Sequence, residues 1–178
     1  STTLEQYKMQ SVANLLSQQT PVFIKSYGLN GLATLNIRGA SAAQSQVFWN
    51  GVPISNAALG MADISLLPVS MINKLHLIYG SSAALWGSGN IGGALLLEAD
   101  EPSFGEKNAY ETALGTGSFG QYQAGGKVQF SKKKFYSGTN IFTQAARNDF
   151  KYEIDSGKHI KTTNAQLRGI ALQQQVAF

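Results

Sequence analysis

The sequence predicts a small α+β domain over residues 1–103, followed by up to four antiparallel strands over residues 104–178. Two observations support this division. The first 97 residues contain six charged side chains, whereas the last 81 contain eighteen. The spacing of apolar residues also changes, from short irregular segments to long segments of alternating polarity. Between the two parts lies the acidic, proline-containing stretch 98–102, which is typical of a linker.

The composition excludes several classes of protein. Charged residues make up 13% of the 178 residues, about half of the usual quarter, while hydrophobic residues make up 43%. A disordered chain would instead combine few apolar residues with a high net charge. A net charge of +4 is too small for the dense basic surface of a nucleic-acid-binding protein. Without cysteine, the chain can form neither a thiolate nucleophile nor a cysteine metal site.

The first part predicts short elements separated by loops. Two uncharged runs, 39–62 and 75–97, raise the question of a transmembrane helix, but the polar residues of the first and the glycines of the second argue against it. Apolar spacing instead predicts a helix over 4–17, and Asn50-Gly51 indicates a turn. The remaining expected elements are strands at 34–37, 46–49, 74–79 and 94–97, and a short helical turn at 69–73.

The second part alternates between apolar and polar residues. The clearest segment is 121–130, and the segment 168–178 repeats it less regularly; 110–116 and 135–146 are two further candidate strands. Strands of about ten residues with one apolar and one polar face suit a membrane β-barrel with a wet interior. An antiparallel sheet on a soluble core gives the same alternation. The alternation alone slightly favours the soluble sheet, because the signal of each barrel strand is weak, whereas the glutamine-rich face and the aromatic strand ends favour the barrel.

Four motifs then follow one another in the first part. They are Asn36–Gly39, Val47–Ile54, Leu67–Gly80 and Ser81–Gly93. In this order they resemble the plug domain of TonB-dependent outer-membrane receptors, and Gly117–Gly120 resembles the first tight hairpin of that family's barrel. The resemblance gives a structural role to Arg38, Gly39, Gly51, Gly80, Gly87, Gly92 and Gly93.

The resemblance implies an outer-membrane receptor that takes up an iron chelate, cobalamin or a glycan. A plug closes the barrel until TonB, which pairs with a segment that is not in these residues, pulls on it. The energy enters mechanically, so no cofactor, nucleotide or catalytic residue is expected. A family barrel has about 22 strands. Four strands alone would leave open edges in the lipid, so we expect this chain to be part of something larger, with outer-membrane lipid around it.

Two alternatives stay open at this point. One is a plug-like subunit that seals or signals within a larger outer-membrane assembly without transport. The other is a soluble carbohydrate-binding β-protein. No enzyme is expected, because the two histidines, His76 and His159, offer no credible Ser–His–Asp set and no metal-ligand spacing.

The expected ligand-binding residues lie in two loops, 26–33 and 55–62, which the resemblance places at the outer tips of the plug. We expect Tyr27, Asn30, Asn56 and Met61 to contact ligand; the alternative is that they are solvated loop tips. These loops contain no acidic residue, so we expect no calcium there.

Four other features have simpler interpretations. A dinucleotide-binding G-x-G-x-x-G motif follows a strand and opens a helix. The match at 87–92 instead precedes the expected strand 94–97, so a nucleotide site is not expected. Arg38 should pair with a carboxylate of the barrel or plug, and Asp63 should cap a turn or join the same network. Lys132–Lys134 could bind anionic lipid or nucleic acid, but the alternating segments around them favour a short hairpin turn, which family topology places toward the periplasm.

Overall fold

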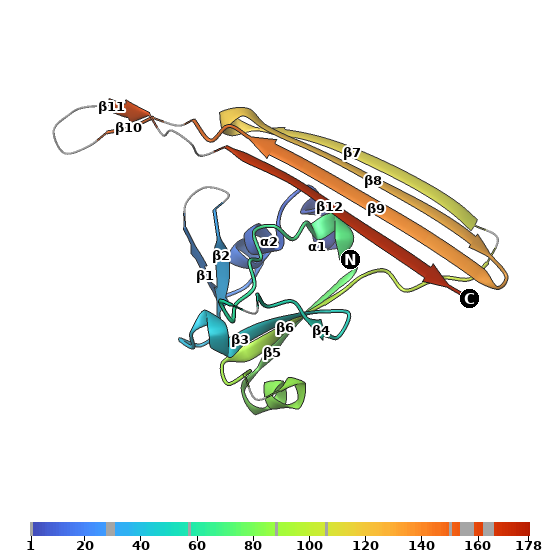
Figure 1. The fold of residues 1–178 in the computed structure, drawn as a ribbon, viewed down its shortest axis with the longest axis horizontal. Coiled ribbons are helices and arrows are strands. Elements are labelled where there is room, and N and C mark those ends of the chain that lie inside the picture. The colour runs from blue at the N-terminus through green and yellow to red at the C-terminus, as the bar shows by residue number, and fades with distance from the viewer. Residues whose placement is uncertain are drawn as a thin grey trace. The chain divides into compact units, whose positions relative to one another are not determined.

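The computed structural model describes residues 2–27, 31–56, 58–87, 89–105, 107–149, 151–153, 159–161 and 166–178 (Figure 1). The chain separates into two compact units, Ser1–Glu101 and Pro102–Phe178. Within the described residues, no helix has both the length and the apolar character needed to cross a membrane.

Unit 1 begins with two helices where the sequence predicted one helix over 4–17. α1 spans Thr2–Gln6 and α2 spans Val12–Gln19. The chain breaks between them because Ser11 adopts an extended conformation and forms an isolated bridge with Pro68. The Ser11 hydroxyl accepts a hydrogen bond from the Asn14 amide at 3.3 Å and so caps α2. The single-helix prediction was therefore wrong.

The strands of unit 1 form two small sheets. β1 (Phe23–Ser26) and β2 (Ala33–Asn36) make an antiparallel hairpin. The second sheet has the order β4-β3-β6-β5, in which β3 and β6 are parallel and the other pairs antiparallel. Its strands are β3 (Ser45–Trp49), β4 (Val52–Pro53), β5 (Lys74–Tyr79) and β6 (Gly93–Glu98). Short 3₁₀ turns lie at Ala42–Gln44, Val69–Met71 and Gly80–Trp86.

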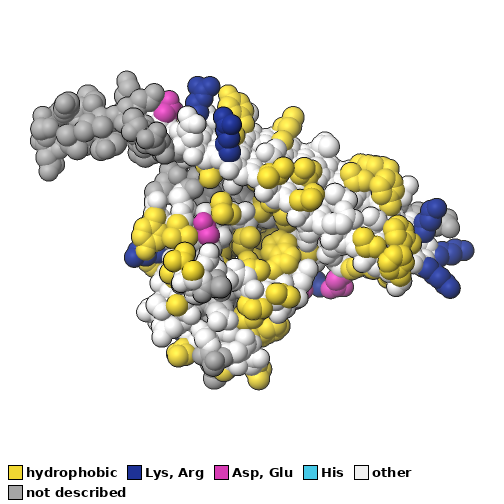
Figure 2. All heavy atoms as spheres, in the orientation of Figure 1, with side chains coloured by type: hydrophobic (Ala, Val, Ile, Leu, Met, Phe, Trp, Pro, Cys, Tyr) yellow, Lys and Arg dark blue, Asp and Glu magenta, His cyan; other side chains and the backbone are white. Residues whose placement is uncertain are grey.

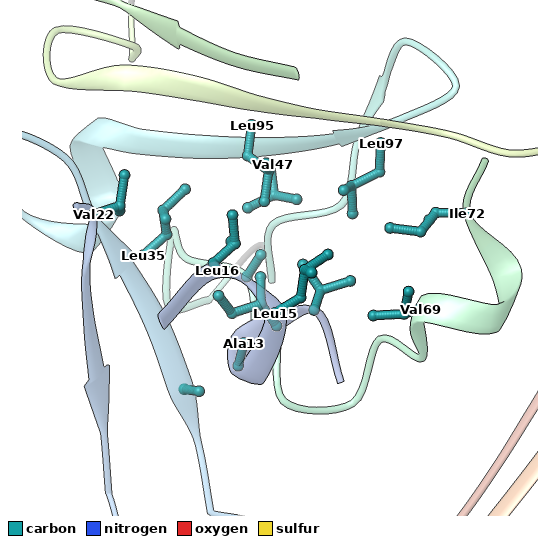
Figure 3. Packing of buried hydrophobic residues seen from close by; sticks show 14 of the residues in the cluster. Ala13, Leu15, Leu16, Val22, Leu35, Val47, Val69, Ile72, Leu95 and Leu97 are labelled. Atoms are coloured by element: carbon teal, nitrogen blue, oxygen red, sulfur yellow. The ribbon is translucent and has the colours of Figure 1, made fainter. Parts of the chain in front are cut away.

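The core of unit 1 lies between α2 and the two sheets. Leu16 of α2, Leu35 of β2 and Val47 of β3 point toward Leu95 and Leu97 of β6 (Figure 3). All five side chains are essentially buried. The alternate residues of β6 are covered on the other side, where a second apolar cluster contains Phe48, Ala83, Ala94 and Leu96. Burial on both faces explains why β6 is a continuous apolar run.

Two neighbouring glycines allow the backbone to approach β6 closely. A Cβ at Gly92 would overlap Ala40 Cβ and lie 3.1 Å from the Ile37 carbonyl oxygen. A Cβ at Gly93, whose φ is +155°, would lie 2.6 Å from the Ile78 carbonyl oxygen. Gly51 differs: its φ of +82° belongs to the turn with Asn50, and nothing lies within 4 Å of its missing Cβ. Gly92 and Gly93 are thus required because a side chain would clash there, whereas Gly51 is favoured only because its backbone has a positive φ.

Unit 2 is a four-stranded antiparallel sheet with the order β12-β9-β8-β7. Its strands are β7 (Lys107–Gly117), β8 (Gln121–Lys132), β9 (Phe135–Ala146) and β12 (Leu167–Ala177). The turn Ser118–Gly120 joins β7 to β8, and Lys133-Lys134 joins β8 to β9, as predicted for both hairpins. A small pair that the sequence did not predict, β10 (Lys151–Glu153) with β11 (His159–Lys161), lies between β9 and β12.

The register of this sheet gives it two different faces. The even-numbered residues of β8 from Tyr122 to Phe130 lie on one face, as the alternation in the sequence predicts. Across the middle of that face, Thr112, Gly126, Ile141 and Leu172 lie in one row, and Leu172 is 69% exposed. The opposite face carries the polar side chains Gln123, Lys127, Gln129, Asn140, Gln144, Gln173 and Gln175.

Three polar side chains on the apolar face satisfy one another. The Thr139 hydroxyl donates to the Gln174 side-chain oxygen at 2.6 Å, and the Gln174 amide donates to the Ser137 hydroxyl at 3.2 Å. These bonds connect β9 with β12. Mutual pairing lowers the cost of placing polar groups among apolar ones.

An ion pair joins the start of β5 to the segment after β6. Lys74 Nζ lies 2.6 Å from Glu101 Oε1 and 3.8 Å from Glu98 Oε2. The hydrogen bond and charge of Glu101 raise the pKa of Lys74, and the same contact lowers the pKa of Glu101.

We expect this pair to contribute a small pH-dependent stability. The ion pair stabilises the fold at pH values between the pKa of Glu101 and the pKa of Lys74. It is lost as the pH falls through the lowered pKa of Glu101, or rises through the raised pKa of Lys74. Glu101→Gln should reduce the loss of thermal stability on acidification at low ionic strength, measured as Tm across a pH series. High salt should abolish the difference because both groups are exposed; an equal difference at high salt would contradict the ion-pair origin.

Candidate ligand-binding site

The first expected ligand loop is the tip of the β1–β2 hairpin. The Tyr27 amide donates to the Leu32 carbonyl at 2.9 Å, which closes the hairpin above its last strand pair, Ser26 with Ala33. The Tyr27 ring is 56% exposed, and Lys25 Nζ lies 4.9 Å from its centroid. The loop therefore presents an aromatic face with a cation beside it. Asn30, the other residue predicted in this loop, lies outside the described residues.

The second expected loop is closed by its own backbone. The Asn56 amide donates to the Met61 carbonyl at 2.9 Å, so these two predicted residues lie side by side at the base of the loop. The Asn56 side-chain oxygen accepts from the amides of Ala58 and Leu59. That oxygen is occupied, so the side-chain NH₂ is the group that Asn56 can offer to a ligand. Met61 is half-buried, and the exposed apolar side chain at the tip is Leu59, which sequence reasoning missed.

Asp63 ties the bases of the two loops together. Its Oδ1 accepts from the Ala33 amide at 3.1 Å, across thirty positions of the chain, while the Ile64 amide donates to the Ala33 carbonyl at 2.9 Å. The same Oδ1 accepts from the Ser65 amide and hydroxyl, which caps the following turn as the sequence predicts. The residues Tyr27 and Met61 thus belong to loops that are fixed to each other at their bases.

Asp63→Ala should loosen both loops at once. The change removes an ionised acceptor from three donors, and hydrogen bonds to a charged group contribute about 1.5–3 kcal/mol. We expect a local loss of about 2 kcal/mol, measured as faster amide hydrogen exchange in peptides that cover 31–36 and 61–66. Asp63→Asn retains an acceptor oxygen and should show a smaller effect. Faster exchange in only one of the two peptides would contradict the shared anchor.

Arg38 has a different partner from the one predicted. It lies in a tight turn with φ +51°, where the Ala40 amide donates to the Ile37 carbonyl. Its guanidinium stacks on the Tyr79 ring at 5.3 Å from the centroid. Among the described residues it forms no ion pair, and Asp63 instead bonds to groups at the loop bases. Within unit 1 a cation–π contact therefore takes the place of the expected plug carboxylate, and a barrel carboxylate as partner stays a prediction.

The remaining chemistry of unit 1 offers no catalytic set. The G-x-G-x-x-G match leads into β6 instead of a helix, which removes the nucleotide interpretation. Within the described ranges, no three His, Asp or Glu side chains gather where they could hold a metal. His76 lines a mostly apolar hollow of about 350 Å³ with Leu4, Leu15 and Leu75. What the loops can do is contact a ligand with one aromatic ring, apolar side chains and an amide donor.

The geometry is that of a mixed α/β unit followed by an antiparallel sheet with one apolar and one hydrophilic face, the pattern that strands of a membrane β-barrel show. Comparison with known proteins then specifies the family. The family described as TonB-dependent Receptor Plug Domain matches residues 1–94, and the chain belongs to it. Proteins of this family are receptors of the bacterial outer membrane and not enzymes. The alternative of a soluble carbohydrate-binding protein is therefore wrong.

Curated relatives include vitamin B12 transporters. BtuB of Photobacterium profundum is 40% identical over 126 residues, which are 70% of this chain and 20% of that transporter. BtuB of Vibrio cholerae is 28% identical over 131 residues, which are 73% and 21%. The chain thus spans about a fifth of the length of these relatives.

Solved structures share the fold. The FrpB iron transporter of Neisseria meningitidis superimposes with a TM-score of 0.74 at 12% identity, covering 97% of this chain and 27% of that one. The copper transporter OprC gives a TM-score of 0.66 at 22% identity, covering 85% and 24%. At such low identity these similarities concern the fold alone.

Proposed function

We propose that this chain supplies the plug, residues 1–103, and the first barrel strands, residues 104–178, of a receptor that imports a scarce or bulky nutrient. TonB supplies the energy, and the plug closes the path until TonB acts on it. The observation that carries the proposal is the 40% identity over 126 residues to a vitamin B12 transporter, within a chain whose residues 1–94 match the plug family.

Among the candidate ligands, cobalamin is the first choice, ahead of an iron chelate or a glycan. The names of the curated relatives support it. The two loops support it as well, because 26–33 and 55–62 contain no charged residue and Lys25, beside Tyr27, adds a single positive charge next to the first. A polyanionic iron chelate would call for several cations at its site. A bulky ligand edged with neutral amides suits an aromatic ring, apolar side chains and the free amide NH₂ of Asn56.

Uptake in cells tests this function. The gene product that carries these residues is expressed in a strain that lacks its own cobalamin and iron-chelate receptors. Labelled cobalamin and a labelled ferric siderophore are then offered with TonB present or deleted. We expect accumulation of cobalamin only when TonB is present. Binding without TonB-dependent accumulation would favour a plug-like subunit that seals or signals, and accumulation of the siderophore alone would reject cobalamin.

Alanine substitutions in both loops test the site. Combining Tyr27→Ala and Asn56→Ala with Met61→Ala should weaken binding of the imported ligand by at least about tenfold, since each interface side chain of this kind contributes about 1 kcal/mol. Asn30→Ala belongs in the same set. Ser17→Ala, an exposed position on α2, is the control. Unchanged affinity in the loop variant would mean that these residues are only solvated loop tips.

A further inference from the structure

A cluster of three lysines occupies the end of the sheet where β8 turns into β9. Lys132 is the last residue of β8, Lys133 and Lys134 form the turn, and all three side chains are exposed. Figure 2 shows Lys and Arg side chains gathered at this end of the sheet. In the part of the chain that the structure describes, no carboxylate pairs with any of the three. The turn therefore carries three uncompensated positive charges.

Aromatic rings border these lysines on the apolar face of the sheet. Phe135 packs against Phe178 with ring centroids 5.5 Å apart, and Phe130 packs edge-on against Tyr110 at 5.9 Å. Phe178 is 91% exposed. Lys132 pairs with Phe135 in the register, so its side chain lies on the same face as the rings. Aromatic rings next to lysines at the end of an apolar band are typical of the boundary between lipid tails and headgroups.

The turn also borders an open hollow on the surface of the sheet. This open hollow of about 760 Å³ is lined by the three lysines, Phe135, Asn108 and Ser131, and most of its lining is apolar. It is large enough for a lipid headgroup. Ammonium groups supply charged donors, and the amide of Asn108 can donate to a phosphate oxygen. The hollow thus combines room, charge and an apolar border at one place.

The lengths of the connections indicate which side of the membrane this end faces. β8 and β9 are joined by two residues, whereas β9 and β12 are separated by the segment 147–166. Outer-membrane barrels have short periplasmic turns and longer extracellular loops. The lysines therefore lie at the periplasmic leaflet. A nucleic acid would not meet this surface.

We propose that the β8–β9 turn binds the phosphate of an anionic phospholipid, such as phosphatidylglycerol, in the periplasmic leaflet. The acyl chains then lie along Phe130, Phe135 and Phe178, and the headgroup occupies the hollow at the lysines. This inference depends on the membrane location of the sheet but not on which nutrient is imported. Each lysine near an anionic surface should strengthen binding about fivefold.

Native mass spectrometry of the gene product, purified from outer membranes in detergent, tests the site by titration with phosphatidylglycerol. We expect K132Q/K133Q/K134Q to weaken binding by at least about tenfold. K132R/K133R/K134R keeps the charge and should retain it. Arg147→Gln with Arg168→Gln removes charge at the opposite end of the sheet and should change binding less than about twofold. The heat-dependent gel mobility of each variant establishes that its barrel is folded.

Three results would overturn the inference. One is equal binding of phosphatidylglycerol by the glutamine variant and the parent protein. Another is equal binding of the zwitterionic phosphatidylcholine, which would mean that net lipid charge is not recognised. The third is preference for lipid A, which belongs to the opposite leaflet. Because no uptake is measured, a receptor that fails to import cobalamin can still support this inference, and one that imports it can still reject it.

Discussion

Replacing Gly93 with alanine is expected to be among the most damaging single changes in unit 1, with a loss of about 3 kcal/mol or more. The added Cβ would lie 2.6 Å from the Ile78 carbonyl oxygen and 2.8 Å from Ile37 Cδ1, while the backbone has φ +155°. The Ile78 oxygen belongs to β5, which pairs with β6 over its whole length. To make room for the Cβ, β5 and β6 would have to move apart, which would break hydrogen bonds between them.

Two further glycines separate the causes of this loss. Gly92→Ala adds crowding against Ala40 and the Ile37 carbonyl and should cost about 2 kcal/mol. Gly51→Ala adds only backbone strain, since its φ is +82° and its surroundings are open, and should cost about 1 kcal/mol. Hydrogen exchange of peptides covering 93–98 in the purified protein measures the local stability. A larger effect at Gly51 than at Gly93 would contradict close packing as the main cause.

Leu172→Arg is expected to prevent stable insertion of the sheet into a membrane. Leu172 lies midway along β12 on the apolar face, in the row with Ile141, and is 69% exposed. An arginine on the lipid face of a barrel costs about 2–4 kcal/mol at the midplane. Gln173→Arg, one residue further on, places the same charge on the polar face and should be close to neutral.

The amount of folded receptor in isolated outer membranes measures this difference, with the heat-dependent gel mobility of the barrel as the criterion for folding. We expect little folded Leu172→Arg and near-parental levels of Gln173→Arg. Equal levels of the two variants would mean that the two faces of β12 do not meet different solvents. More folded Leu172→Arg than Gln173→Arg would mean that the polar face of the sheet faces the lipid.

The strands of unit 2 could be predicted because each strand shows its own alternation of apolar and polar residues. In β8 the alternation of side chains is itself the consequence of facing two environments, so the residues report it directly. Unit 1 is different. The break between α1 and α2 depends on Ser11 meeting Pro68, more than fifty residues away, and no local pattern contains that contact. β1 was missed because three of its four residues are exposed.

The sequence identifies the two candidate loops as uncharged segments, but it does not show how they are arranged. The sequence identifies Asn56 as a polar loop residue, yet it does not show that its side-chain oxygen is already bonded to Ala58 and Leu59. The link from Asp63 to Ala33 likewise exists only in the folded chain. At Arg38 the charge of the guanidinium predicts a carboxylate partner, whereas within unit 1 the folded chain places this group over the Tyr79 ring.

The parallel pairing of β3 with β6 has a kinetic consequence. Residue 45 pairs with residue 93, a separation of 48 positions, whereas β7, β8 and β9 pair through turns of two or three residues. Closing the longer loop costs chain entropy before any contact compensates for it. The hairpins formed by β7, β8 and β9 should therefore pair before β3 pairs with β6. Until β6 pairs with β3, the hydrogen-bonding groups on that edge of β3 stay open to other chains.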